Sequence, residues 1–250
     1  MNLEGKTALI TGGYRGIGLA CSRALAKSGS HIAIAARSLE KCEDMAKTLS
    51  NEYRINAKGF YLDVSNKESV QETVDMVTSE FHTIDILINA AGISGVQKPI
   101  IDLSEDEFDE VFNIDLKGTL FVCQAVSRLM MAQNSGKIIN IASVLGKIAT
   151  PYMAGYCISK ASVIQLTKVM ALELAKHNIQ VNVICPGYFL TDINKAFFES
   201  ERGKRYIKER IPLNRLGKLE EIESTIIYLS SAPAFLTGAE IVIDGAQTVI

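Results

Sequence analysis

The sequence predicts an α/β fold in which a doubly wound parallel sheet of about seven strands is covered by helices on both faces. Short apolar runs alternate with amphipathic runs of helical length along the whole chain. The strand-like runs are apolar throughout, as in strands that are buried on both faces. A glycine-rich turn follows the first of them, which favours the doubly wound sheet over a closed barrel.

The expected strands are Thr7–Ile10, His31–Ala36, Gly59–Leu62, Ile84–Ile88, Lys137–Ile141, Gln180–Ile184 and Glu240–Ile243. The expected helices span 17–28, 39–52, 66–80, 104–133, 153–177 and 219–231. Ser104 and Glu107 have the spacing of a capping box at the start of the fourth helix, and Asn113 interrupts that helix. Residues 188–215 have no clean period. Because no linker or repeat divides the chain, we expect a single domain over 1–250.

Composition excludes several classes of protein. The chain is 48% hydrophobic and 22% charged, which excludes a disordered chain, and its net charge of −2 argues against nucleic acid as a partner. No apolar run reaches the roughly 18 residues that a membrane span needs, and the first residues do not resemble a signal peptide. Five cysteines without a CxxC spacing, and three scattered histidines, argue against disulfides and metal and favour the cytoplasm.

The turn after the first strand carries glycines in the spacing GxxxGxG, at Gly12, Gly16 and Gly18. Gly12 allows a tight turn, Gly16 lets the backbone approach a pyrophosphate, and Gly18 lets the helix pack on the sheet. A tight turn without a ligand is the alternative interpretation. The position of the turn, after the first strand of a βαβ unit, favours phosphate binding.

This turn resembles that of the single-domain short-chain dehydrogenases/reductases, and further motifs of that family recur in order over the full length. They are Asp63-Val64, Asn89-Ala90-Ala91-Gly92, Asn113, Ser143, Tyr156-x-x-x-Lys160, Pro186-Gly187 and Asp244-Gly245. The resemblance implies a Rossmann-like fold, hydride transfer between a nicotinamide dinucleotide and a carbonyl or alcohol carbon, and a homotetramer or homodimer. Ala246 departs from the glycine that many relatives carry there, which puts the tetramer in some doubt.

The resemblance also implies a set of cofactor contacts. Asp63 matches the contact on the adenine side, although an N-cap of the next helix is an equally good role for it. The backbone at Pro186-Gly187 is expected to hold the carboxamide of the nicotinamide, with Thr191 nearby. The full expected set is Gly12, Tyr14, Arg15, Gly16, Ile17, Gly18, Arg37, Ser38, Asp63, Val64, Asn89, Ala90, Gly92, Tyr156, Lys160, Pro186, Gly187, Phe189 and Thr191.

The end of the second strand favours NADP(H) over NAD(H). NAD-binding folds of this kind carry an acidic residue there, which binds the ribose hydroxyls. This chain has Ala36 at that position, followed by Arg37, and Arg15 lies in the glycine turn. Two guanidinium groups can bind a 2′-phosphate through charge-assisted hydrogen bonds. The alternative is that one or both arginines only face solvent.

Tyr156 and Lys160 are four residues apart on a predicted helix, so their side chains share one face. A free tyrosine loses its proton only near pH 10, but a neighbouring ammonium favours the phenolate. Tyr156 would then exchange a proton with the substrate, and the Ser143 hydroxyl would donate to the substrate oxygen. By resemblance, Lys160 also reaches the nicotinamide ribose, and Asn113 holds a water joined to the lysine. An amphipathic helix with a snorkelling lysine is the alternative.

The stretch of about 188–215 is expected to be the substrate lid. It carries Phe189, Phe197, Phe198 and Tyr206 among many charged residues. The chain resembles both 3-oxoacyl-acyl-carrier-protein reductases and gluconate 5-dehydrogenase-like reductases, and the former are favoured. For a sugar acid, Lys195, Arg202 and Arg205 are candidates for binding the carboxylate. A dinucleotide-sensing protein without turnover is a further alternative, which the presence of both Tyr156 and Lys160 disfavours.

Overall fold

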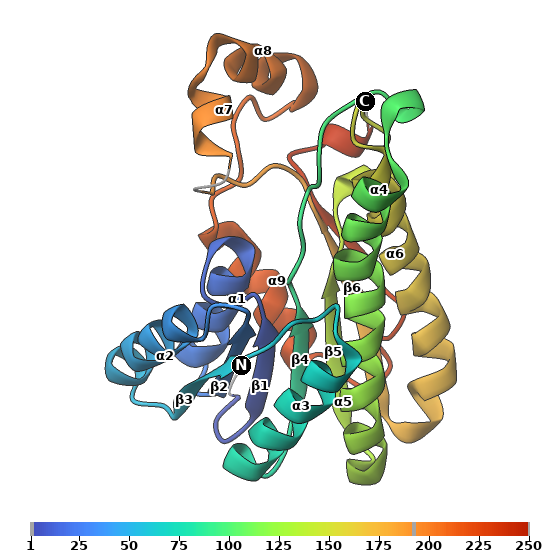
Figure 1. Ribbon diagram of the computed structural model, residues 1–250. Helices are drawn as coiled ribbons and strands as arrows, with labels where there is room; N and C mark the ends of the chain where they lie inside the picture. The colour runs from blue at the N-terminus through green and yellow to red at the C-terminus, as the bar shows by residue number, and fades with distance from the viewer. Residues whose placement is uncertain (1–2, 192–193, 250) are drawn as a thin grey trace.

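A computed structural model describes residues 3–191 and 194–249. The residues outside this description are Met1, Asn2, Asp192, Ile193 and Ile250. Asp192 and Ile193 belong to the expected lid. The fold is one parallel sheet of seven strands in the order β3-β2-β1-β4-β5-β6-β7, between two layers of helices (Figure 1). The predicted fold class is therefore confirmed. Within the described residues, no helix is both long and apolar enough to span a membrane.

The seven strands fall where the apolar runs predicted them, with ends that differ by at most a few residues. They are β1 Thr7–Thr11, β2 His31–Ala36, β3 Ala57–Tyr61, β4 Ile86–Asn89, β5 Gly136–Ile141, β6 Ile179–Pro186 and β7 Glu240–Ile243. All five residues of β1 and all eight of β6 are buried. Strands that are covered on both faces in this way have no polar face, which is why their sequences do not alternate.

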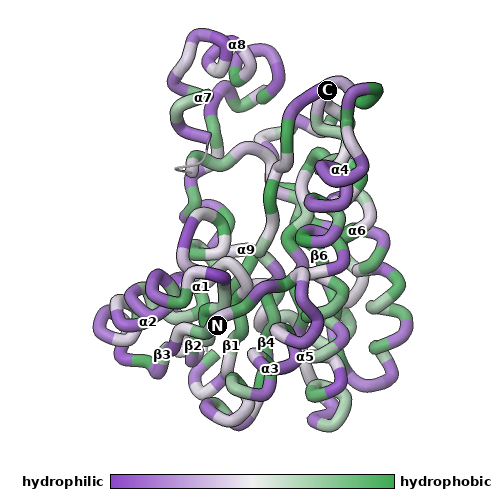
Figure 2. The backbone as a smooth tube through the Cα atoms, viewed as in Figure 1, coloured by the Kyte–Doolittle hydropathy of each residue, from purple (hydrophilic) through white to green (hydrophobic). Residues whose placement is uncertain are grey.

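The helices form two layers, each with its own apolar core against one face of the sheet. The described helices are α1 Gly16–Lys27, α2 Leu39–Tyr53, α3 Lys67–Phe81, α4 Glu105–Val111, α5 Thr119–Gln133, α6 Ala154–Leu174, α7 Lys195–Glu199, α8 Glu201–Arg210 and α9 Glu220–Ser231. Residues of α1, α2 and α9 form one core, and residues of α3, α5 and α6 form the other. In Figure 2 the strands are mostly green, the colour of apolar residues, and α8 is mostly purple, the colour of polar residues.

Local sequence sets several helix ends. The predicted capping box is present, because the Ser104 side chain accepts from Glu107 N while the Glu107 carboxylate accepts from Ser104 N. Helix α3 is capped by Asn66, whose Oδ1 accepts from Ser69 N at 2.9 Å. The N-cap is thus not Asp63, the residue that the sequence analysis considered for this role. Asp63 instead accepts from the backbone N–H and hydroxyl of Ser65.

The long helix expected over 104–133 is interrupted where Asn113 predicted a break. Residues Phe112–Gly118 form a π-helical segment between α4 and α5. A π-helical turn adds a residue to the turn and so changes which side chains face inward, and such segments are frequent at functional sites. Here Asp115 and Gly118 are the buried residues of the segment. Gly118 lies against Val64, where a Cβ would come within 2.7 Å of a valine methyl carbon.

The stretch after β6 is more regular than its sequence suggested. It contains the helices α7 and α8, which stand away from the sheet in Figure 1. The Ser200 hydroxyl caps α8 by accepting from Gly203 N at 3.2 Å. The apolar period was hard to see because α7 has only five residues and few residues of either helix are buried.

The order of strands reverses between β1 and β4, and a buried polar network spans the ends of the strands beside this point. Asn89 Nδ2, on β4, donates to Asn140 Oδ1, on β5, at 2.9 Å, and Asn140 Nδ2 donates to Thr167 Oγ1, on α6, at 2.9 Å. Asn140 and Thr167 have no exposed surface. Burial raises the pKa of the neighbouring Cys123 thiol to about 12, so this side chain stays neutral. The network joins the two strands to α6.

We predict that Thr167→Val, which keeps the shape but removes the hydroxyl, lowers the free energy of unfolding by about 1–3 kcal/mol, because Asn140 Nδ2 loses its acceptor in the interior. Urea unfolding followed by circular dichroism measures this change. Ser162→Ala is the matched control, since it removes a more exposed hydroxyl from the same helix. Equal stability of the two variants would contradict a structural role for the network.

Candidate active site

The glycine turn has the backbone conformation that its spacing predicted. Gly12 and Gly16 have φ angles of +68° and +52°, which side chains other than hydrogen disfavour. A Cβ on Gly18 would collide with the carbonyl of Gly12, so this glycine allows α1 to begin directly under the turn. Arg15 occupies the N-cap position of α1 and makes no side-chain capping bond. The first N–H groups of the helix therefore remain available to an anion.

Two neighbouring loops are tied to this turn. Thr11 Oγ1 accepts hydrogen bonds from Ala90 N and Ala91 N, both at 3.1 Å, so the loop after β4 is held against the end of β1. Gly12 N donates to Ala35 O at 2.9 Å, which places the end of β2 beside the turn. Arg37, the residue after β2, and Arg15 are both exposed at this edge. The Arg15 guanidinium carbon lies 5.5 Å from the centre of the Tyr14 ring.

The loop after β6 reaches the same edge. Gly187 N donates to Ile243 O at 2.8 Å, and Phe189 forms an isolated bridge with Gly217. Thr191 lies over the glycine turn, since a Cβ on Gly16 would come within 3.6 Å of its methyl group. Asn89 differs from the other expected cofactor residues. Its side chain points into the buried network and is 4% exposed, although its Oδ1 has no hydrogen-bond partner.

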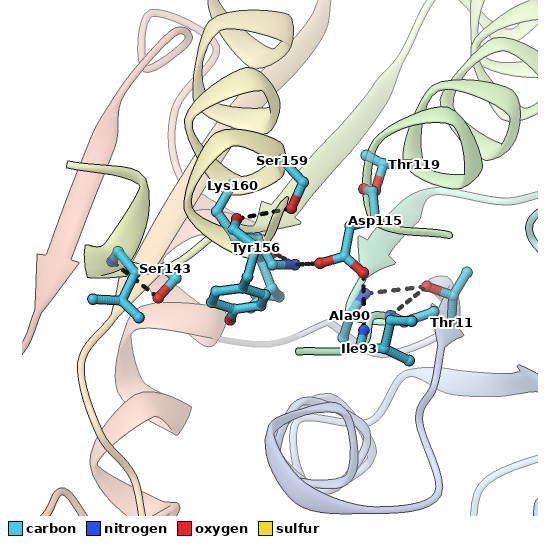
Figure 3. Close-up of polar contacts among 12 residues, drawn as sticks. Thr11, Ala90, Ile93, Asp115, Thr119, Ser143, Tyr156, Ser159 and Lys160 are labelled. Atoms are coloured by element: carbon cyan, nitrogen blue, oxygen red, sulfur yellow. Dashed lines mark hydrogen bonds and ion pairs between the residues drawn. The ribbon is translucent and has the colours of Figure 1, made fainter. Parts of the chain in front are cut away.

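Ser143, Tyr156 and Lys160 lie at the carboxyl end of the sheet, where the sequence predicted them (Figure 3). Ser143 follows β5 and is 7% exposed, and its Oγ accepts from Leu145 N at 3.1 Å. The short 3-10 turn after it packs on α6, because a Cβ on Gly146 would lie within 3 Å of the Lys160 backbone. Lys160 Nζ lies 5.5 Å from the centre of the Tyr156 ring. The structure therefore brings the three predicted residues together.

Asp115, in the π-helical segment, is a site residue that the sequence analysis missed. Its carboxylate has no exposed surface, and its Oδ2 lies 3.2 Å from Lys160 Nζ. Its other oxygen, Oδ1, accepts from Ile93 N at 2.8 Å. An acidic residue between two apolar ones, Ile114 and Leu116, was the available signal. Among the described residues, this acid forms the ion pair with the lysine. Asn113 is half-buried in the same segment, and its expected link to the lysine through a water stays a prediction.

The ionisation of Lys160 reflects its buried position. Burial by itself lowers the pKa of this ammonium, but the negative charges of Asp115 and of an ionised Tyr156 raise it, and the net direction is upward. Lys160 is therefore protonated at neutral pH. Nζ also donates to Ile141 O at 3.3 Å. An ammonium has three donors, so this bond and the ion pair leave one hydrogen for a ligand.

Aromatic residues cluster over the site in the expected lid. The Tyr188 ring centre lies 5.2 Å from that of Phe198 and 5.3 Å from that of Tyr206. Tyr206 OH donates to Tyr188 OH at 3.3 Å and accepts from Gln247 Nε2 at 3.2 Å. Gln247 is buried, and its Oε1 has no hydrogen-bond partner. Burial raises the pKa of the Tyr188 phenol, so this group remains a neutral hydroxyl.

Comparison with known proteins identifies close relatives over the whole chain. The family model described as "Enoyl-(Acyl carrier protein) reductase" matches residues 12–248. The chain is 37% identical to D-threitol dehydrogenase of Mycolicibacterium smegmatis, covering 99% of this chain and 94% of the relative. It is 36% identical to the 3-oxoacyl-[acyl-carrier-protein] reductase of Aquifex aeolicus, covering 99% of each.

Solved structures agree with these matches. A gluconate 5-dehydrogenase from Burkholderia cenocepacia, in complex with NADP and tartrate, superposes with a TM-score of 0.95 at 36% identity, over 100% of this chain and 97% of the other. A short-chain type dehydrogenase/reductase from Mycobacterium marinum superposes with a TM-score of 0.93 at 36% identity, over 100% and 98%.

Proposed function

Because this chain belongs to the short-chain dehydrogenase/reductase family, and is an oxidoreductase that acts on carbonyl or alcohol groups, we propose that it uses NADP(H) and reduces a 3-oxoacyl thioester. The observation that carries the proposal is the arrangement of Ser143, Tyr156 and the buried Lys160 at one edge of the sheet, beside the glycine turn. The expected site residues, Asn113 with its water included, are proposed to act there, and Asp115 is added to them as the ion-pair partner of the lysine.

The residues at this edge fit a nicotinamide dinucleotide. The free N–H groups of α1 and the positive φ angles of Gly12 and Gly16 suit a pyrophosphate. Gly187 and Thr191, on the loop that reaches this edge, are proposed to hold the nicotinamide end, and the remaining donor of Lys160 suits a ribose hydroxyl. The bound cofactor supplies or accepts the hydride at the substrate carbon. Every other role in the reaction falls to side chains of this chain.

In the direction of reduction, the Tyr156 hydroxyl gives its proton to the substrate oxygen as the hydride reaches the carbon. The Ser143 hydroxyl donates a hydrogen bond to the same oxygen and stabilises its developing charge. The Lys160 ammonium stabilises the phenolate that remains on Tyr156. Oxidation of the alcohol uses the same groups in reverse, with the phenolate accepting the proton.

The lid, about 188–215, is proposed to select the substrate. Its aromatic cluster and the exposed Phe197, Leu190 and Leu213 offer apolar surface to an acyl chain or a pantetheine arm. Several of the curated relatives are named 3-oxoacyl-[acyl-carrier-protein] reductase, which supports this substrate class.

A keto sugar acid is the second candidate substrate, and one observation favours it. The hydroxyls of Tyr188 and Tyr206 and the amide of Gln247 form a chain of hydrogen bonds beside the aromatic cluster, and Gln247 Oε1 is unpaired. Such polar groups suit a polyhydroxylated substrate. Lys195, Arg202 and Arg205 are all exposed on the lid helices, where they are candidates for the carboxylate.

We predict that the purified protein oxidises NADPH with a 3-oxoacyl thioester and that Tyr156→Phe lowers this turnover by about 10²–10⁴-fold, since the proton donor is lost. The Tyr156→Phe variant should still bind NADPH. Absorbance at 340 nm measures turnover, with 5-ketogluconate offered in parallel. Tyr228→Phe, an exposed tyrosine on α9, is the control. Turnover of 5-ketogluconate alone would show that the substrate is a keto sugar acid and not a 3-oxoacyl thioester. Full activity of Tyr156→Phe would contradict the mechanism.

The cofactor preference has its own test. We predict that NADPH binds more tightly than NADH and that Arg37→Ala weakens NADPH binding about tenfold or more, while NADH binding changes little, because only the 2′-phosphate needs the guanidinium. Titration of nicotinamide fluorescence gives both affinities. Arg128→Ala removes the same charge from an exposed position on α5 and should change neither affinity. Equal affinity of the unmodified protein for both dinucleotides would refute the phosphate contact.

The assembly is proposed to be a homotetramer or homodimer located in the cytoplasm. Helix α6 exposes Leu172, Val169 and Ile158, of which Leu172 is 83% exposed, and a second copy of this helix would cover such a face. All five cysteines are free, which suits a reducing compartment. We predict that Leu172→Glu lowers the mass measured by light scattering after size-exclusion chromatography. An unchanged mass would exclude this face as an interface.

A further inference from the structure

The catalytic lysine lies between two groups that carry or acquire negative charge. Figure 3 shows Lys160 Nζ between the ring of Tyr156 and the carboxylate of Asp115. The distance to the nearer carboxylate oxygen is 3.2 Å, and the distance to the ring centre is 5.5 Å. Asp115 has no exposed surface and Lys160 has a side chain that is 7% exposed, so water does not screen the pair. The charge of Asp115 therefore acts on the same ammonium that Tyr156 depends on.

The carboxylate is held firmly in this position. Asp115 Oδ1 accepts a hydrogen bond from Ile93 N at 2.8 Å. The backbone carbonyl of Asp115 accepts a hydrogen bond from the Thr119 hydroxyl at 2.7 Å. Gly92 makes room for the pair, because a Cβ there would lie 3.2 Å from both Asp115 Oδ1 and Lys160 Nζ. Asp115 Oδ2 faces the ammonium without the alignment of a hydrogen bond, so the contact is chiefly ionic.

A carboxylate at this place has two opposite effects on the site. It stabilises the buried ammonium, which would otherwise bear the full cost of burial. It also cancels part of the positive field at Tyr156, because a compensated ammonium attracts a phenolate less than an isolated one does. The first effect keeps Lys160 charged and oriented. The second weakens the attraction between the ammonium and a phenolate on Tyr156.

We infer that Asp115 is a positioning residue that fixes Lys160 and sets the pH range of the proposed reaction, moving it to higher pH than a neutral side chain at this position would. The inference rests on the proposed role of Tyr156 as the proton-exchanging group. It concerns the residue's charge rather than its shape, and this separates it from a purely structural role.

Few other charged groups face Asp115, Lys160 and Tyr156 from the elements packed against them. Helix α6 contributes Lys160 and Tyr156, the loop after β4 contributes the backbone of Gly92 and Ile93, and β5 contributes the carbonyl of Ile141. Lys117, in the same π-helical segment, is exposed. Tyr188, in the lid, and Cys157, on α6, are the other titratable groups near the phenol, and burial keeps Tyr188 neutral. Among the described residues, the Asp115–Lys160 pair therefore supplies the charges next to the phenol.

The test is Asp115→Asn, which is nearly isosteric and removes the charge. We predict that the midpoint of the pH profile for alcohol oxidation moves to lower pH by about one unit, a tenfold change in proton affinity. The alkaline limb of the reductive profile should move in the same direction by the same amount. The change should appear in kcat more than in the KM for substrate, because Asp115 does not touch the substrate.

A measurement without substrate separates this inference from the proposed function. With ¹³C-labelled tyrosine and bound NADP, the resonance of Tyr156 is assigned by its loss in Tyr156→Phe, and its titration is followed directly. We expect it to lose its proton at lower pH in Asp115→Asn, whatever the substrate is. If the protein turned over neither carbonyl compound, this titration would still decide the role of Asp115.

Two further variants complete the design. Asp109→Asn makes the same substitution on the exposed face of α4 and should leave the titration and the pH profile unchanged. Asp115→Ser removes the charge with a smaller side chain, so the inference does not depend on how one amide packs. NADPH binding and thermal melting identify folded variants. Titration of Tyr156 at the same pH in both Asp115 variants and the unmodified protein, or an equal shift in Asp109→Asn, would overturn the inference.

Discussion

The ammonium of Lys160 is buried between the sheet and the helix layer, and a charge in such a place costs several kcal/mol unless nearby groups compensate it. Asp115 supplies the opposite charge and Ile141 supplies a carbonyl. Asp115 must itself be held in position by neighbouring residues. The π-helical segment turns Asp115 inward, Ile93 binds its second oxygen, and Gly92 leaves space for both charges. Much of the local structure at this edge therefore follows from keeping one lysine charged and in place.

The sheet provides the rigid frame for this arrangement. Because all strands are parallel, the carboxyl ends of β1, β4, β5 and β6 lie at one edge, and the order of strands reverses there between β1 and β4. Open α/β sheets bind their ligands at such a point. Thr11 holds the loop after β4 against the glycine turn, and the Asn89–Asn140–Thr167 network joins β4 and β5 to α6. A shift of α6 would move Tyr156 and Lys160 together, so the network maintains their distance from the strand ends.

Periodicity predicted most of the fold, because each strand is apolar throughout and each long helix has an apolar face. Ser143, Tyr156 and Lys160 were predicted from the resemblance to the short-chain dehydrogenases/reductases, together with the position of Ser143 after a strand and the four-residue spacing of the other two on a helix. Neither periodicity nor the resemblance found Asp115. The break in the long helix was seen at Asn113, but the inward rotation two residues later depends on the π-helical turn, which leaves no periodic signal. The two lid helices were missed for a similar reason, since few of their residues are buried.

Hydrogen bonds join the lid to the C-terminal segment, and Tyr188 lies at the end of these bonds that faces the proposed active site. Asp244 accepts from Ala246 N and Thr248 N and so holds Ala246 at φ +74°, a conformation that favours glycine. This turn brings Gln247 to Tyr206, and Tyr206 reaches Tyr188. Tyr188 stays neutral and Lys160 is paired with Asp115, which agrees with the proposal that Tyr156 exchanges the proton with the substrate. In the proposed mechanism, the chemistry depends on the buried pair and substrate selection depends on the lid, so the two can vary separately.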